Sequence, residues 1–237
     1  GEIITPKGSV PVISTNLCFK DLLGAWKVRW GINRMNYRIN PGLYAVGKPD
    51  HTSPVLVSAN YKLTFDVLRK ELSGLDCWIL ILDTKGINVW CAAGKGTFGT
   101  DELVNRISKT GLPEIVSHRK LVLPQLGATG VSAHEVARQT GFSVVYGPVR
   151  AKDIKAFLNS GFKATEEMRT VKFTTWNRLV LTPVELVTAA KFSLVVFGVM
   201  FLINLFAVRA FGIRDFIVYS GAVITGTVIT PLILPVI

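Results

Sequence analysis

The chain has 237 residues, a formal net charge of +11 and a hydrophobic content of 49%. That length allows one or two domains, and the charge would suit a nucleic acid, an anionic membrane surface or an anionic ligand. No basic run interleaved with aromatic residues appears, so we expect no nucleic-acid partner. The three cysteines, Cys18, Cys77 and Cys91, are widely spaced and form no C-x-x-C pair. They therefore predict neither a disulfide framework nor a zinc or iron–sulfur site, and they indicate a reducing compartment.

Residues 1–48 carry the weakest structural signal, and we expect them to pack on the core as an N-terminal extension. Apolar and basic residues alternate from Trp26 to Trp30, which predicts a half-exposed strand. The aromatic residues there are predicted to pack rather than to bind a ligand. The nearby cations are predicted to form a solvated face, with a partner-protein surface as the weaker alternative. The aromatic residues are Trp26, Trp30 and Tyr37, and the cations are Lys27, Arg29, Arg34 and Arg38.

A regular alternation of strands and helices then fills residues 49–162. Apolar runs bounded by turn residues predict strands at 54–58, 77–82, 120–123 and 143–146. Amphipathic segments predict helices at 64–72, 100–109, 132–139 and 151–159, with Thr64 and Thr100 as the capping residues of the first two. Because the strands are apolar on both faces, the fold class is α/β with a doubly wound, mainly parallel, Rossmann-like sheet.

The C-terminal part of the chain changes character. Residues 163–185 are predicted to be a linker with short strands at 171–176 and 178–181, which Pro183 breaks off. Residues 186–208 and 215–237 are long and apolar enough to be transmembrane helices, joined by a loop over 209–214. A buried soluble hairpin is the alternative. We expect further helices beyond the end of this sequence.

Polar residues inside and around these spans give weaker signals. Lys191 can extend its charge to the membrane surface, and Asn204 is predicted to join the helices. Arg169, Lys172 and Arg178 favour a multi-pass protein of the inner (cytoplasmic) membrane, with the α/β domain in the cytoplasm.

Ligands of parallel sheets bind at the carboxyl ends of the strands. Segments 58–62, 83–85, 124–130 and 147–151 follow the four strands and are rich in glycine, hydroxyl and amide groups. They fit a large ligand with many amides and one phosphate, with Lys95 or Arg150 near the phosphate. The alternative is that these segments are ordinary turns, which also favour glycine, proline and serine. No G-x-G-x-x-G or Walker motif is present. His51, His118 and His134 have no second ligand at metal-binding spacing, so they are predicted to be surface or capping residues.

Residues 88–95 read Asn-Val-Trp-Cys-Ala-Ala-Gly-Lys and follow the second predicted strand. The alanines favour a helical turn and leave a smooth surface that can lie against a large flat ligand. The exposed N–H groups of a first helical turn would favour the thiolate of Cys91. A buried structural cysteine is an equally good alternative from composition alone.

This stretch resembles the cap-helix motif of the HgcA family, the corrinoid proteins of microbial mercury methylation. The surrounding residues, about 40–161, resemble the corrinoid-binding domain of the large subunit of the corrinoid iron–sulfur protein of acetyl-CoA synthesis. The resemblance implies a cobalamin or related corrinoid between the sheet edge and the cap segment, with Cys91 thiolate as the lower axial ligand of cobalt. Such a thiolate would donate electron density to the metal and assist transfer of a methyl group with its electron pair to Hg(II).

The implied function is that of a membrane-anchored, corrinoid-dependent methyltransferase that makes methylmercury. The alternatives are a corrinoid methyl carrier of one-carbon metabolism without a mercury role and a non-catalytic membrane protein. Expected partners are membrane lipid, Hg(II), a methyl donor protein or methyltetrahydrofolate-type system, and a ferredoxin-like [4Fe–4S] protein resembling HgcB. The last would act as reductant and possible mercury donor. Cys91 is the implied catalytic and cobalt-binding residue. The implied cofactor-binding residues are Ser58, Asn60, Thr64, Thr84, Asn88, Val89, Trp90, Cys91, Ala92, Ala93, Gly94, Lys95, Gly127, Thr129, Gly130, Gly147, Pro148, Val149, Arg150 and Ala151.

Overall fold

The computed structural model describes residues 1–207 and 210–234. The chain folds into two compact units. The α/β unit comprises Gly1–Gly24 and Met35–Val171, and the helical unit comprises Ala25–Arg34 and Lys172–Ile237. Helix α1 (Phe19–Arg29) and the 3₁₀ turn η1 (Arg34–Asn36) contain the points where the chain passes from one unit to the other.

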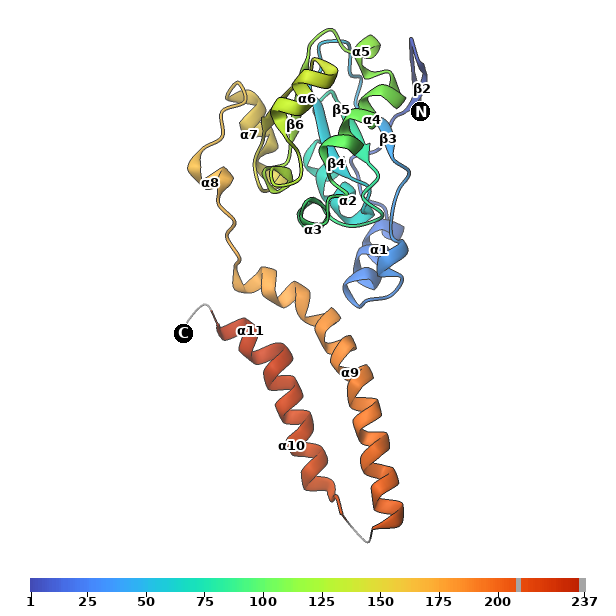
Figure 1. Cartoon of the computed structure of the whole chain (residues 1–237), viewed down its shortest axis with the longest axis vertical. Helices are drawn as coiled ribbons and strands as arrows, with labels where there is room; N and C mark the ends of the chain where they lie inside the picture. Colours follow the sequence, from blue (N-terminus) through green and yellow to red (C-terminus); the bar gives the residue numbers. More distant parts are fainter. Residues whose placement is uncertain (208–209, 235–237) are drawn as a thin grey trace. The chain divides into compact units, whose positions relative to one another are not determined.

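Strands and helices alternate through most of the α/β unit (Figure 1). Its strands are β1 (Glu2–Thr5), β2 (Gly8–Pro11), β3 (Gly42–Val46), β4 (Val55–Ala59), β5 (Cys77–Leu82), β6 (Lys120–Leu123) and β7 (Ser143–Tyr146). Its helices and 3₁₀ turns are α2 (Lys62–Glu71), α3 (Val89–Gly94), α4 (Thr100–Thr110), α5 (Leu112–Ile115), η2 (Gln125–Gly127), α6 (Ala133–Thr140), η3 (Ala151–Asp153), α7 (Ile154–Asn159) and α8 (Glu166–Arg169). The mixed α/β class is therefore confirmed.

The central sheet has five strands in the order β3-β5-β4-β6-β7. Strands β4 to β7 are parallel to their neighbours, and β3 is antiparallel to β5 at one edge. The predicted parallel-rich sheet is confirmed. The sequence did not predict β3, whose Gly42 and Ala45 are poor strand formers, or the separate β1–β2 hairpin.

Side chains alternate between the two faces of the sheet, and helices cover both faces. Leu56, Ile79 and Val122 face the layer built from α2 and α7. On the other face, one apolar cluster contains residues of α4, α5 and α6, and strand residues such as Val57 and Leu80 pack into it. Because both faces are covered, the strands need apolar residues at most positions, as the sequence pattern indicated.

Three local predictions were wrong. Residues 26–29 lie in helix α1, and Trp30 lies in the turn that follows it, rather than in a strand. Helix α2 begins after Tyr61 rather than at Thr64. The N–H of Lys62, at its first position, donates a hydrogen bond to the carbonyl of Tyr37, which is remote in the sequence. Helix α4 is capped by Gly99 rather than by Thr100. The Thr100 hydroxyl instead accepts a hydrogen bond from Ser132 N at 2.9 Å.

The helical unit contains α9 (Thr175–Phe206), α10 (Ile213–Ile224), the π-helical segment η4 (Thr225–Ile229) and α11 (Thr230–Ile233). The strands predicted at 171–176 and 178–181 are wrong, since α9 begins at Thr175. Pro183 lies inside α9 and does not end it. A proline removes one backbone hydrogen bond, and the long apolar helix continues past it. The predictions for Val208, Arg209 and residues 235–237 fall outside the described residues.

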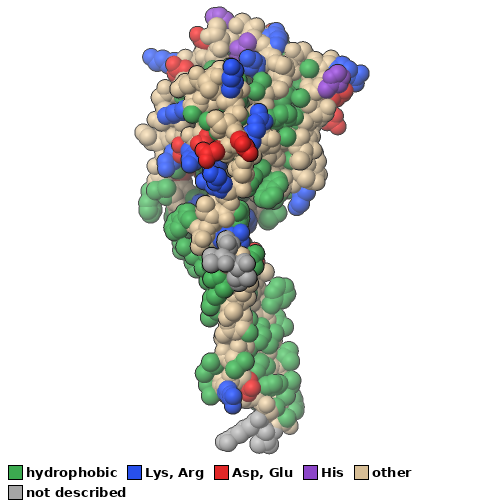
Figure 2. All heavy atoms as spheres, turned by 90° about the vertical axis from the view of Figure 1, so that its left-hand side faces the viewer, with side chains coloured by type: hydrophobic (Ala, Val, Ile, Leu, Met, Phe, Trp, Pro, Cys, Tyr) green, Lys and Arg blue, Asp and Glu red, His purple; other side chains and the backbone are tan. Residues whose placement is uncertain are grey.

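Two helical stretches, Thr175–Phe206 and Ile213–Ile233, have the length and apolar composition of a membrane span, and their side chains are mostly exposed. Hydrophobic side chains make up much of the visible surface of this pair, with charged side chains near its lower end (Figure 2). The two stretches contact each other through aromatic rings, with Phe197 5.3 Å from Phe216 and 5.2 Å from Tyr219. Asn204 bonds both the N–H and the carbonyl of Phe211, which lies in the segment before α10, so it holds the turn between the helices and does not bridge the helices themselves.

Candidate functional site

The carboxyl ends of β4, β5, β6 and β7 lie at one edge of the sheet, because these strands are parallel. The strand order reverses at β4, with β5 on one side of it and β6 on the other. Ligands of doubly wound sheets bind at such a reversal, outside the carboxyl ends of the strands. Helix α3, which follows β5, contacts both β4 and the η2 turn after β6. The cap segment therefore lies at the position where this fold class binds ligands.

Helix α3 has two opposite faces. Val89, Ala92 and Ala93 are buried in the core, whereas Trp90 and Cys91 are exposed. Residues three and four apart share a face of a helix, so the motif divides into a packing side and a free side. The alanines serve the packing side. The expectation that they form a surface for a flat ligand is therefore wrong, and Trp90 and Cys91 are the side chains presented outward.

Asn88 fixes the start of this helix. Its side-chain oxygen accepts a hydrogen bond from Cys91 N at 2.9 Å, so Asn88 is the N-cap and Cys91 is in the first turn. A cap of this kind stabilises a helix by about 1 kcal/mol. The predicted first-turn position of Cys91 is confirmed, and the alternative of a buried structural cysteine is excluded.

Asn60 holds the loop that leads into the cap helix. It is 1% exposed. Its side-chain oxygen accepts hydrogen bonds from Thr84 N at 3.2 Å, Thr84 Oγ1 at 2.9 Å and Gly86 N at 2.9 Å. Its amide nitrogen donates to Asp83 Oδ1 at 3.2 Å. These contacts occupy the polar atoms of Asn60, and Thr84 is fully buried. Both residues are thus positioning residues for the β5–α3 loop in this structure.

The loop after β6 packs tightly under the cap helix. A β-carbon at Gly130 would overlap the Phe98 carbonyl oxygen and lie 2.9 Å from Ala93 Cα. A β-carbon at Gly127 would lie 2.6 Å from the Phe98 ring. Glycine is required where two backbones approach this closely. Phe98 is fully buried and was not predicted as part of the site, although the glycines on both sides of it signal close packing.

The remaining predicted residues are spread along the same edge. Ser58 is 3% exposed inside β4, and Thr64 is in the first turn of α2. Thr129 is exposed, Gly147 and Pro148 are buried, and Val149, Arg150 and Ala151 are half-buried around the start of η3. Gly94 and Lys95 are exposed at the end of α3.

Lys95 and Arg150 follow β5 and β7, which are the second and fifth strands of the sheet. Three strand spacings separate these two strands, about 14 Å. Lys95, however, follows β5 only after α3, which contacts β4 and η2, so the placement of one of these cations near a phosphate stays a prediction.

The described residues contain no cluster of three or more His, Cys, Asp or Glu side chains able to hold a metal ion. The three thiols differ in access, since Cys18 and Cys91 are exposed and Cys77 is buried. Burial raises the pKa of the Cys77 thiol to about 12, so Cys77 is unsuited to metal binding. At the candidate site, Cys91 can offer one thiolate, which does not suffice for a bare metal ion but can complete the coordination of a metal held by its own ring.

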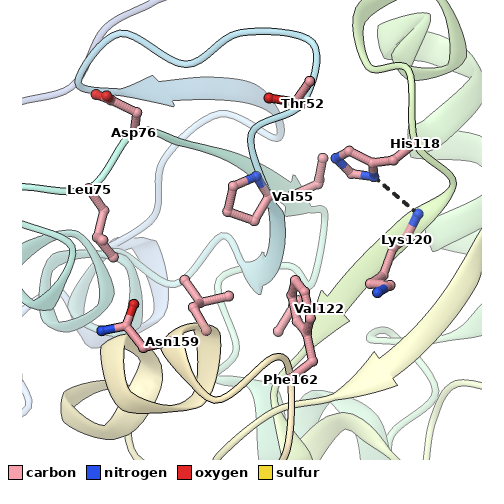
Figure 3. A pocket seen from close by; sticks show the side chains of 11 residues that line it. Thr52, Val55, Leu75, Asp76, His118, Lys120, Val122, Asn159 and Phe162 are labelled. Atoms are coloured by element: carbon pink, nitrogen blue, oxygen red, sulfur yellow. Dashed lines mark hydrogen bonds between the residues drawn. The ribbon is translucent and has the colours of Figure 1, made fainter.

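A cavity of about 440 Å³ lies at the opposite, amino-terminal edge of the sheet. The walls around it include Val55, Val122 and Phe162, with Lys120 on the right-hand side and Asp76 at the upper left of the view (Figure 3). His118 is held there as a structural residue. Its Nδ1 accepts from Lys120 N at 3.2 Å, and its Nε2 is 2.9 Å from the Ser53 carbonyl. The cavity is thus separate from the candidate site.

Residues 31–158, more than half of the chain, match the family described as CO dehydrogenase/acetyl-CoA synthase delta subunit. The chain belongs to this family. It is 34% identical over 122 residues to an acetyl-CoA decarbonylase/synthase complex subunit gamma of Methanopyrus kandleri, a match that covers 51% of this chain and 26% of the relative. It is 32% identical over 126 residues to the same subunit of Methanocaldococcus jannaschii, covering 52% and 25%. With that subunit of Archaeoglobus fulgidus it shares 32% over 135 residues, covering 56% and 28%.

The chain spans about a quarter of the length of these relatives. The likeness to proteins of acetyl-CoA synthesis is confirmed. None of these three names refers to mercury, so the likeness to the HgcA family stays a prediction.

Family membership implies a corrinoid cofactor, and the residues present fit one. Helix α3 lies at the reversal of strand order, and Gly127 and Gly130 let the loop after β6 pack closely beneath it. The outward thiol of Cys91 could contribute one ligand to the metal of such a group, whose ring would supply the others. Trp90, 58% exposed, adds an aromatic surface beside it.

Proposed function

We propose that this chain is a membrane-anchored, corrinoid-dependent methyltransferase in which Cys91 binds cobalt as its lower axial ligand. The observation that carries the proposal is the exposed Cys91 on the outward face of α3, at the reversal of the strand order. A lone cysteine in such a place has no packing role, and no neighbouring metal-ligand cluster of the described residues explains it.

The described side chains would hold and orient the cofactor. Asn88 fixes the backbone of Cys91, and the Asn60–Thr84 contacts hold the loop that precedes it. Cys91 Sγ, as a thiolate, would bind the cobalt of the corrinoid and donate electron density to it. When bound, the corrinoid would supply the cobalt-bound methyl group, which must leave with both electrons of its bond to reach Hg(II). Methylmercury is the product that we propose.

A second candidate is a corrinoid methyl carrier of one-carbon metabolism, and the comparisons favour it. The relatives are named as subunits of an acetyl-CoA decarbonylase/synthase complex. A carrier that passes a methyl cation needs no thiolate below the cobalt, so Cys91 is the feature that separates the two candidates.

We further propose a multi-pass attachment to the inner membrane, supported by the two long apolar stretches, with the α/β unit in the cytoplasm. Reduction of the cobalt after each turnover would need an external protein. The described residues hold no cluster of candidate ligands, so a ferredoxin-like [4Fe–4S] protein is the partner that we propose. Such a protein could also deliver Hg(II) through its cysteines, and a methyl donor protein or methyltetrahydrofolate-type system would supply the methyl group.

The test compares the full chain with Cys91→Ala, using Cys18→Ala as a matched exposed-cysteine control. Each protein is reconstituted with cobalamin, and cobalt content, visible spectrum and methylmercury formation are measured. We expect Cys91→Ala to change the Co(III) spectrum and to abolish methylmercury formation, and Cys18→Ala to do neither.

Three other outcomes count against parts of the proposal. Identical spectra for wild type and Cys91→Ala would reject the axial-ligand role. A thiolate-dependent spectrum without methylmercury would favour the carrier. Failure of both proteins to bind cobalamin would reject the corrinoid function altogether.

A further inference from the structure

Residues 25–34, here called the tryptophan segment, belong to the same compact unit as the two long apolar stretches. The segment contains the end of α1, which Gly31 closes with φ +77°. The N–H of Ile32 bonds the Lys27 carbonyl at 2.9 Å, and the N–H of Gly31 bonds the Val28 carbonyl at 3.1 Å. These two bonds form a Schellman motif, so the segment is an ordered helix end and not a loose linker.

The segment packs against the beginning of α9. Val28 is 1% exposed, and a β-carbon at Gly31 would lie 3.9 Å from both the Val184 and the Val187 side chains. These contacts place the tryptophan segment beside residues Val184 to Val187 of α9.

That level can be compared with the thickness of a bilayer. A hydrocarbon layer of about 30 Å corresponds to roughly 20 residues of helix. Counted back from Phe206, where α9 ends, this places the boundary of the layer near Val187. The tryptophan segment therefore lies where hydrocarbon gives way to headgroups.

Its surface has the chemistry of that zone. Trp26 and Trp30 are 54% and 36% exposed, and their ring centroids are 5.9 Å apart on one side of the helix. The cations Lys27, Arg29 and Arg34 lie within the same ten residues. Tryptophan is enriched at membrane–water interfaces, and lysine and arginine near them attract anionic lipids. The sequence alone predicted packing for these tryptophans, which their exposure contradicts.

We propose that the tryptophan segment inserts into the headgroup region of an anionic bilayer, as an interfacial attachment beside the two spans. This inference rests on the proposed membrane anchoring of the helical unit. The second attachment would hold the start of α9 at a fixed depth.

The test uses the full chain labelled with 5-fluorotryptophan and reconstituted into vesicles of phosphatidylcholine and phosphatidylglycerol that contain a headgroup nitroxide lipid. Single Trp→Phe variants assign the fluorine signals. We expect the signals of Trp26 and Trp30 to broaden several-fold more than that of Trp78, which is 2% exposed in the core of the α/β unit. Equal broadening of all three would overturn the inference and leave the surface to a protein partner.

Two controls separate this inference from the anchoring itself. Flotation of the vesicles after a carbonate wash reports the insertion of the apolar stretches. Flotation without selective broadening would reject only the insertion of the tryptophan segment. Loss of flotation would reject both that insertion and the membrane anchoring of the apolar stretches. We also expect Lys27→Gln/Arg29→Gln to reduce the broadening in anionic vesicles, whereas Lys152→Gln/Lys155→Gln, at η3 and α7 of the α/β unit, leaves it unchanged. Equal effects of the two double variants would reject the anionic-lipid preference.

Discussion

The core of the α/β unit and the surface of the helical unit are built from the same apolar residue types, but their surroundings are opposite. Leu80 in β5 is fully buried between two helical layers, whereas Val195 in the middle of α9 is 65% exposed. Helix α2 of the α/β unit turns Phe65, Leu68 and Leu72 to the core and carries charged residues elsewhere. Helix α9 has no comparable division. One unit therefore buries its apolar side chains within itself, whereas the other leaves many of its apolar side chains exposed.

The largest effect is expected where a charge enters the core of the α/β unit. Leu80→Asp would place an unpaired carboxylate in the apolar cluster between β5 and the helices α4, α5 and α6. Such burial costs several kcal/mol, which is comparable to the whole stability of a domain. We expect loss of cooperative unfolding of the α/β unit, measured by circular dichroism in urea. A folded variant of normal stability would contradict the fully buried position of Leu80.

The α/β unit does bury charges, but in pairs. Arg69, 7% exposed, bonds Asp66 at 2.8 Å and Asp21 at 2.6 Å, and Lys62 bonds the same two carboxylates at 2.6 Å. Burial alone would raise the pKa of Asp21, but hydrogen bonds from Lys62, Cys18 and Arg69 outweigh it and hold that pKa below its ordinary value. The cluster connects the N-terminal residues to α2.

Arg69→Met removes one member of this cluster and leaves buried carboxylates with half their partners. We expect a loss of about 3–5 kcal/mol in the free energy of unfolding, measured by urea titration. Arg138→Met is the matched control, because the Arg138–Glu135 pair is exposed and such pairs contribute about 1 kcal/mol or less. Equal losses in the two variants would show that the Arg69 cluster is no stronger than a surface pair.

Val195→Asp introduces a carboxylate into the helical unit, as Leu80→Asp does into the α/β unit. If α9 spans a bilayer, a carboxylate at its centre costs about 3 kcal/mol, and we expect a reduced inserted fraction in flotation assays with the α/β unit still folded. Val67→Asp is the control, since Val67 is 48% exposed on α2 of the α/β unit. An unchanged inserted fraction for Val195→Asp would count against the span.

The contrast also separates what the sequence could predict from what it could not. Strands at 77–82, 120–123 and 143–146 were predicted with the observed bounds, because each is a short apolar run between turn residues. The helical start after Tyr61 depends on a bond from Lys62 to the distant Tyr37, which no local pattern reveals. The alternation at 26–30 fits a short strand or a helix face, and the packing of Gly31 on α9 decides for the helix.

At the candidate site, the cap segment and the first-turn position of Cys91 were predictable from the motif. Its two faces were not, because the burial of Ala92 and Ala93 depends on Gly130 approaching from a loop more than thirty residues later. The role of Asn60 was not predictable either, because its hydrogen-bond partners lie more than twenty residues later in the chain. Asn60 was predicted to bind the cofactor, whereas its side chain bonds the β5–α3 loop.

The smallest effect that we predict is the difference between alanine substitutions at two glycines, Gly130 and Gly221. A methyl group at Gly130 would meet backbone atoms of Phe98 and Ala93, which cannot move aside as a flexible side chain can, whereas nothing lies within 4 Å of the same position at Gly221 in α10. We expect Gly130→Ala to cost about 1–3 kcal/mol and to weaken cobalamin binding, because α3 must shift. Gly221→Ala should be neutral or stabilising by up to about 1 kcal/mol, since alanine favours a helix. Urea unfolding and cobalamin titration of both variants make the measurement. Similar behaviour of the two would show that α3 tolerates displacement, and the close packing beneath the cap helix would then not explain how Cys91 is held.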